Sequence, residues 1–186
     1  MIWFSADLHF GHAGILKHQP ERASLFADTV AMDAAIIAGI NLCAQPNDEL
    51  WILGDFAWKA SRYGHYRQRI KCQKVHVVMG NHDSSSLRAN VSSLNDTVYR
   101  KFGLTKHPSG KFHLSHYPIA SWRGREHGAI HLYGHSHGSM ETTLNAMWPE
   151  RRAMDVGIDC AYRVLGQWRP FSLTEIYLRF PEAINV

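Results

Sequence analysis

Five short groups of residues in this chain carry side chains that bind metal ions, and each group follows an apolar run typical of a β-strand. The groups are Asp7-Leu8-His9, Gly54-Asp55, Gly80-Asn81-His82-Asp83, Ser115-His116 and Gly134-His135-Ser136-His137. Strand ends in an α/β sheet gather at one edge, where open sheets build their sites. Seven residues able to coordinate a metal would converge there, which is more than one zinc ion needs. The sequence therefore predicts two metal ions and hydrolytic chemistry.

The residue types in these groups suit divalent metal ions, although each group alone has an ordinary structural explanation. Asp7 and His9 are two positions apart just past a strand, so their side chains can point the same way. A carboxylate with an imidazole suits manganese, iron or zinc. A single Asp-x-His is more often an Asx-turn, and a single Gly-Asn-His-Asp more often a plain turn. The occurrence of all five groups in order, each after a strand, favours metal binding.

Helix and strand patterns in the first half place these groups at the ends of parallel strands. Apolar runs predict strands over residues 2–6, 50–53 and 75–79, with helices over 28–44 and 61–73 between them. Asp28 or Thr29 is the expected N-cap of the first of these helices. The alternation of strand and helix indicates right-handed parallel crossovers.

The second half of the chain predicts a second sheet, which we expect to be largely antiparallel and packed on the first. Its strands are expected over residues 98–102, 111–115, 130–133 and 154–158. Residues 84–97 and 138–153 are expected to form loops. Ser172 and Glu175 have the spacing of a capping box, which predicts a short C-terminal helix.

Bulk composition indicates one soluble globular domain spanning residues 1–186. Hydrophobic residues make up 45% and charged residues 19% of the chain, and the formal charge of +4 comes from scattered lysines and arginines. The three cysteines form no CxxC pair, so we expect reduced thiols and a cytoplasmic protein. No apolar run is long enough for a transmembrane helix, and no membrane partner is expected. The sequence does not determine the oligomeric state.

The order Asp-x-His, Gly-Asp, Gly-Asn-His-Asp, His and Gly-His-x-His resembles the calcineurin-like metallophosphoesterases. The variant running from Asp7 to His12 is similar to the small single-domain bacterial and phage members. The resemblance implies an α/β (α+β) fold, a four-layer αββα sandwich of two mixed sheets flanked by helices, with a binuclear metal centre at the C-terminal ends of the strands. It also implies which residues hold each ion. One ion would be held by Asp7, His9, Asp55 and His137, and the other by Asp55, Asn81, His116 and His135.

The same resemblance implies a mechanism and a role for His82. Two divalent ions with few anionic ligands would leave a positive pocket that attracts phosphate and yields a bridging hydroxide near neutral pH. That hydroxide would attack phosphorus, while His82 assists the leaving group as a proton donor or by its charge. His12 and Asp83 are expected to support the ligands, and Asp83 or Asp155 could orient a histidine.

Substrate contacts are expected from the loops around the site. Arg123 or Arg125 could clamp a phosphate, and Trp58 or Trp122 could stack on a base. We expect a phosphodiesterase acting on a small phosphoester, a nucleotide or a nucleic acid. Phosphomonoesterase activity is the close alternative, and a non-catalytic protein-binding scaffold on the same fold is the third. Manganese (Mn) is the expected ion, with Fe, Ni or Zn as alternatives.

Overall fold

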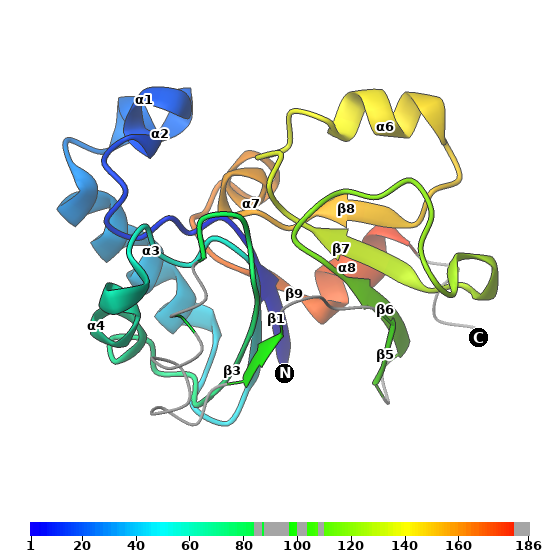
Figure 1. Cartoon of the computed structure of the whole chain (residues 1–186), viewed down its shortest axis with the longest axis horizontal. Helices are drawn as coiled ribbons and strands as arrows, with labels where there is room; N and C mark the ends of the chain where they lie inside the picture. The colour runs from blue at the N-terminus through cyan, green and yellow to red at the C-terminus, as the bar shows by residue number, and fades with distance from the viewer. Residues whose placement is uncertain (84–86, 88–96, 100–103, 108–109, 181–186) are drawn as a thin grey trace.

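The structure is a computed structural model that describes residues 1–83, 87, 97–99, 104–107 and 110–180 (Figure 1). Its first sheet has the strand order β4-β3-β2-β1-β9. The strands are β1 (Ile2–Ser5), β2 (Glu49–Leu53), β3 (Lys74–Val78), β4 (Thr97–Tyr99) and β9 (Phe171–Ser172). β1 to β4 are parallel, and β9 runs antiparallel to β1. The predicted parallel crossovers of the first half are confirmed.

The second sheet has the order β5-β6-β7-β8. Its strands are β5 (Leu104–His107), β6 (Gly110–Leu114), β7 (Ile130–Tyr133) and β8 (Ala153–Asp155). Only the β5–β6 pair is antiparallel, whereas β6, β7 and β8 are parallel neighbours. The prediction of a largely antiparallel sheet was therefore wrong. The strand expected over residues 98–102 was also misplaced, because β4 pairs with β3 in the first sheet; residues 100–102 lie outside the described part of the chain.

The helices form around these sheets where the sequence supplies caps and apolar faces. The long helix α3 (Thr29–Cys43) begins at Asp28, whose side chain accepts a hydrogen bond from the Ala31 amide, as predicted. The predicted capping box is also present, and it starts α8 (Leu173–Arg179). The helix expected over 61–73 is shorter, a 3-10 turn η1 (Ala60–Arg62) followed by α4 (Tyr63–Arg67). The remaining elements are α1 (Ile15–His18), α2 (Pro20–Leu25), η2 (Arg125–His127), α6 (Glu141–Met147) and α7 (Ile158–Leu165).

Two apolar layers hold four structural layers together. α3 packs its buried isoleucines, such as Ile36 and Ile40, against Leu50 and Val77 of the first sheet. The opposite face of that sheet meets the second sheet in a separate core that includes Phe4, Trp51, Phe112 and Leu132. Burying each such side chain stabilises the fold by about 1.5–3 kcal/mol.

A smaller cluster beneath α6 covers the outer face of the second sheet. The sequence of layers is therefore helix, sheet, sheet, helix, and the expected αββα sandwich is confirmed (Figure 1). α6 lies within residues 138–153, where only a loop was expected. Among the described helices, none combines the length and the apolar composition needed to cross a membrane.

Candidate metal centre

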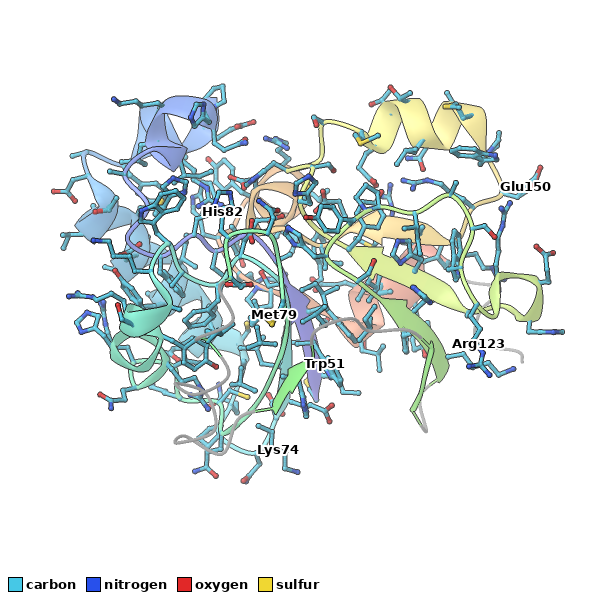
Figure 2. All side chains as sticks on the ribbon, in the orientation of Figure 1. Trp51, Lys74, Met79, His82, Arg123 and Glu150 are labelled. Atoms are coloured by element: carbon cyan, nitrogen blue, oxygen red, sulfur yellow. The ribbon has the colours of Figure 1, made fainter. Side chains whose placement is uncertain are left out.

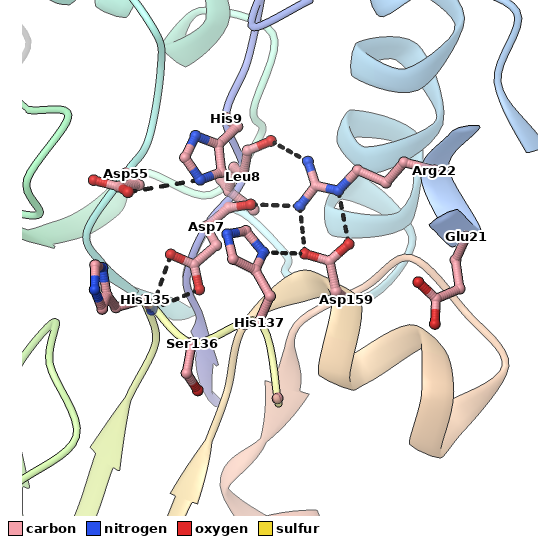
Figure 3. Close-up of polar contacts among 12 residues, drawn as sticks. Asp7, Leu8, His9, Glu21, Arg22, Asp55, His135, Ser136, His137 and Asp159 are labelled. Carbon is pink, nitrogen blue, oxygen red and sulfur yellow. Dashed lines mark hydrogen bonds and ion pairs between the residues drawn. The ribbon is translucent and has the colours of Figure 1, made fainter. Parts of the chain in front are cut away.

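The C-terminal ends of β1, β2, β3, β6 and β7 bring the five metal-binding groups together. Figure 3 shows the residues from the β1, β2 and β7 loops side by side, and Figure 2 marks His82 in the β3 loop. Backbone hydrogen bonds fix the first two loops to each other. The Asp7 amide donates to the Gly54 carbonyl at 3.0 Å, and the His9 amide donates to the Asp55 carbonyl at 2.9 Å. Close packing continues at the β3 loop, where a Cβ on Gly80 would lie 2.1 Å from Asp55 Oδ1. The site therefore needs glycine at this position.

Backbone strain is concentrated at these strand ends. The non-glycine residues with positive φ in the described structure are Asp7, His9, Asp55, His135 and His137, with φ between 48° and 68°. A left-handed backbone costs an L-residue about 1 kcal/mol or more. The fold holds this strain at five of the seven predicted ligands, which indicates that the side-chain directions it produces are functional.

A first set of donor atoms comes from the β1 and β7 loops. Ligand atoms of Asp7, His9 and His137 all lie within 4.8 Å of one another, close enough to hold one metal ion. The rings of His9 and His137 stack at 5.3 Å between centroids. His9 Nε2 is buried and has no hydrogen-bond partner among the described residues, and its nearest carboxylate oxygen, on Asp55, is 3.6 Å away. An orphaned buried nitrogen of this kind fits a metal ligand.

A second set lies beside the first and shares Asp7 with it. Asp7, Asp55 and His116 form another group within 4.8 Å, and His116 Nε2 is 3.5 Å from Asp55 Oδ2. Asn81 Oδ1 lies 2.9 Å from His116 Nε2 and 2.9 Å from His135 Nδ1. The structure thus brings all seven predicted ligands close together, in overlapping groups that share Asp7, His9 and Asp55 and that could bind metal ions.

Burial gives both carboxylates raised pKa values. The pKa of Asp7 is well above its ordinary value because the group is fully buried and faces Asp155 and Asp55. Burial also raises the pKa of Asp55. The basic groups within 4.0 Å of these two carboxylates, in the described part of the chain, are the imidazoles of His9, His82 and His116, which carry a positive charge only when protonated. Cations placed between them would relieve the cost of two buried negative charges.

The buried histidines favour the neutral form that metals require. Burial lowers the pKa of His116 to about 4 and lowers that of His9 further. His116 Nδ1 lies 2.8 Å from the Leu53 carbonyl and can donate to it. With its proton on Nδ1, the ring leaves the lone pair of Nε2 free to bind a metal, and Nε2 faces Asp55 and Asn81.

His82 and His12 lie at the rim of the centre. His82 is 34% exposed, its amide donates to Asp55 Oδ1 at 2.9 Å, and its Nε2 is 4.0 Å from Asp55 Oδ2. The His82 and His9 rings meet edge to face at 5.2 Å. His12 Nδ1 lies 3.3 Å from His9 Nδ1, and the His12 ring stacks on Trp58 at 3.9 Å. His12 therefore contacts the predicted ligand His9 through its ring, while the partly exposed His82 lies beside both His9 and Asp55.

The carboxylate that orients the predicted ligand His137 is Asp159, which the sequence analysis missed. Its Oδ2 accepts from His137 Nδ1 at 2.7 Å (Figure 3). Arg22, fully buried on α2, donates to both Asp159 oxygens at 2.7 Å and to the Asp7 and Leu8 carbonyls. Burial alone would raise the pKa of Asp159, but the Arg22 guanidinium and its hydrogen bonds lower it below the ordinary value. An ionised Asp159 thus fixes His137 with Nε2 directed away from it.

Asp83 and Asp155 do not orient histidines, contrary to expectation. Asp83 accepts from the amides of Asp55 and Gly80, both at 2.8 Å, and so ties the β2 and β3 loops together. Asp155 accepts from the Ser136 hydroxyl and from the Gly138 and Gly157 amides. The hydrogen-bond donors to these two carboxylates are thus main-chain amides and the Ser136 hydroxyl, and both carboxylates hold the backbone around the predicted ligands.

The structure does not bring the predicted arginine clamp into the centre. Arg123 lies well away from His82 (Figure 2). The Arg125 guanidinium sits 5.5 Å from the centroid of the Trp122 ring and donates to the Ala120 carbonyl. Trp122 itself is buried beneath α6 with Ala129 and Tyr133, so it offers no face to a base. Trp58, at 43% exposure, remains available.

Asp159→Asn is expected to lower the affinity for metal ions about 10- to 100-fold. Three donor atoms, from Arg22 and His137, converge on the two Asp159 oxygens, and an amide offers only one acceptor. A metal titration followed by calorimetry measures the loss. Glu126→Gln, which changes an exposed carboxylate on η2, is the control. Unchanged affinity in Asp159→Asn would show that His137 needs no orienting carboxylate.

Comparison with known proteins supports the fold and leaves the activity open. No family model matches the chain. The gene 66 protein of Mycobacterium phage L5 is 26% identical, with 89% of each chain covered. A protein of unknown function from Aquifex aeolicus superposes with a TM-score of 0.74 at 22% identity, covering 96% of this chain and 98% of that one. It shares the fold. A phosphoesterase from E. coli gives a TM-score of 0.37 at 16% identity over 73% of this chain and 69% of that one, which is too low to indicate a common fold.

Proposed function

We propose that this protein is a binuclear metal-dependent phosphoesterase of the calcineurin-like type, with phosphodiesters as its preferred substrates. The observation that carries the proposal is the pair of adjacent donor sets around Asp55, built from two buried carboxylates, one amide and four imidazoles. The orphaned His9 Nε2 and the strained ligand backbones fit a bound metal rather than a closed polar network.

The residues would divide between two ions. Asp7, His9, Asp55 and His137 would hold one, and Asp55, Asn81, His116 and His135 the other, with manganese as the expected metal. When bound, two divalent ions would neutralise charge on a phosphoryl group and make water a nucleophile near neutral pH. Asn81 and His135 are the exposed members of the site, and His82 beside them is partly exposed, so a phosphoester would enter from their side.

His82 is the residue suited to the leaving group. Its backbone is held by Asp55, while its partly exposed ring stands at the rim between His9 and Trp58. An imidazole there can donate a proton to the departing oxygen of the ester. Asp83 would support this position by fixing the turn that carries Asn81 and His82.

Metal-stripped protein, reloaded separately with Mn, Fe, Ni and Zn, tests the proposal on bis(p-nitrophenyl) phosphate and p-nitrophenyl phosphate. We expect both activities to vanish on stripping and the diesterase activity to return with at least one ion. Return of the monoesterase activity alone would make the protein a phosphomonoesterase. If no ion restores either activity, the protein is better explained as a non-catalytic protein-binding scaffold on the same fold.

A further inference from the structure

A cleft borders the metal centre, and Trp58 lies between the two. The cleft has a volume of about 380 Å³ and lies between η1, α4, the start of α3 and the loop after β1. We call it the basic cleft, and the lining residues that define it are Trp58, Lys59, Arg62, His65, Tyr66 and Arg69. This volume falls in the range of small-molecule sites.

The basic cleft presents three cations at its surface against one buried carboxylate. Lys59, Arg62 and Arg69 are exposed, and in the described part of the chain none of the three forms an ion pair with a carboxylate. Asp33 is the acidic residue in the described lining, but it is buried, and its oxygens accept from the Gly11 amide at 3.1–3.2 Å and from the Tyr66 hydroxyl. Asp33 therefore supports the cleft wall, and the cations remain available to an anion.

Local structure presents these cations toward the same space. Lys59 and Arg62 belong to one turn, in which the Arg62 amide donates to the Lys59 carbonyl at 2.8 Å. The Arg62 guanidinium lies 5.9 Å from the centroid of the Tyr66 ring. Arginine and lysine placed around an aromatic floor are suited to a phosphate group that is attached to a ring system.

Trp58 connects the basic cleft to the reacting centre. Its ring stacks on His12 at 3.9 Å and lies 5.2 Å from His82, and it also lines the cleft. The Trp58 amide donates to the Phe10 carbonyl, which fixes its loop to the one that carries His9. A ligand that spans the two sites would place a flat group beside Trp58, with one phosphate at the metal centre and a second in the cleft.

We propose that the basic cleft binds the phosphate next to the scissile one in a nucleotide chain. The base of the nucleoside that links these two phosphates would stack on Trp58. The proposal rests on the phosphoesterase function and narrows its substrate class to oligonucleotides. Binding through several phosphate contacts also predicts that the affinity falls steeply as salt is raised.

Paired substrates that differ by one phosphate test this proposal. One pair is thymidine 5′-(p-nitrophenyl phosphate) with and without a 3′-phosphate, and the other is thymidine 3′-(p-nitrophenyl phosphate) with and without a 5′-phosphate. We expect kcat/KM to be about tenfold higher for the doubly phosphorylated member of at least one pair, since 1.4 kcal/mol of binding corresponds to tenfold. Lys59→Ala/Arg62→Ala should abolish that preference, whereas Lys74→Ala/Arg179→Ala, which removes two exposed cations elsewhere, should retain it. If the unmodified protein hydrolyses the substrates but turns over both members of each pair equally, or if the preference survives in Lys59→Ala/Arg62→Ala, the proposal is overturned.

An equilibrium measurement separates failure of the cleft from failure of the proposed function. Thymidine 3′,5′-bisphosphate is titrated into the metal-loaded protein by calorimetry and compared with both thymidine monophosphates. We expect the bisphosphate to bind about tenfold more tightly than either, and Lys59→Ala/Arg62→Ala to lose this difference. If no ester is hydrolysed but the bisphosphate still binds preferentially, the proposal for the cleft is supported and the proposed phosphoesterase function is wrong. Equal affinities overturn the cleft whatever the activity.

Discussion

Asp55→Asn is expected to reduce phosphoester turnover on the order of a thousandfold or more and to lower metal content from two ions per chain. Asp55 Oδ2 faces both donor sets, at 3.6 Å from His9 Nε2 and 3.5 Å from His116 Nε2. A neutral amide would remove the negative charge that the two proposed ions share. Because metal ions supply several kcal/mol of transition-state stabilisation and 1.36 kcal/mol is tenfold in rate, this loss is large. Metal analysis and turnover on a diester measure it.

In the metal-free protein, the same substitution is expected to preserve or increase the free energy of unfolding. Burial raises the pKa of Asp55, so between the unfolded value near 3.9 and the raised folded value the folded state binds more protons. The free energy of unfolding therefore decreases as pH rises through that window. Asparagine carries no such penalty and can still accept the His82 amide hydrogen bond.

Urea unfolding in the presence of a chelator checks this reversal. Metal-free Asp55→Asn should be at least as stable as the metal-free unmodified protein at pH 8, and its advantage should shrink as the pH falls through the raised pKa of Asp55 toward the unfolded value near 3.9. Glu126→Gln, which alters an exposed carboxylate, should show no such trend. A metal-free Asp55→Asn that is the less stable protein at pH 8 would show that Asp55 is structural rather than a site for cations.

The positions of the donor residues could be predicted from sequence because they depend on local patterns. Short apolar runs identified β1, β2 and β3, and parallel strands must end at a common edge, so Asp7, Asp55 and Asn81 had to approach one another. The helix start at Asp28 and the capping box at Ser172 were likewise fixed within four residues of chain. In each case the pattern that identifies the element lies within a few neighbouring residues.

What sequence could not provide are contacts between distant segments. The short strands of the second half carry no mark of direction, and their parallel pairing is set by long connections that cross outside the sheet. Arg22 and Asp159 are separated by 137 positions, and an arginine in a short helix gives no signal that it will be buried. The basic cleft is equally hidden, because Asp33 and Arg69 become neighbours only when α3 and α4 pack on the same sheet face.

His82→Ala is expected to keep both metal ions and still lose about 10²- to 10⁴-fold in turnover, the usual contribution of a positioned proton donor. The His82 ring stands at the open rim, with its Nε2 at 4.0 Å from Asp55 Oδ2. However, His9, Asp55 and His82 also form a group close enough to hold a metal. The two roles predict different outcomes, since a lost ligand lowers metal content whereas a lost proton donor does not.

The leaving group of the substrate separates these roles further. If His82 donates a proton, the loss in His82→Ala should be greatest for esters of alcohols, whose oxyanions need protonation, and smallest for p-nitrophenyl esters, whose phenolate leaves unaided. A missing metal would instead slow all esters to a similar degree. Kinetics on both kinds of ester, with metal analysis of each preparation, decide between them. His127→Ala, on the exposed turn η2, is the matched control. An equal loss on both esters together with one ion per chain would make His82 a ligand, and undiminished turnover with two ions would remove it from the mechanism.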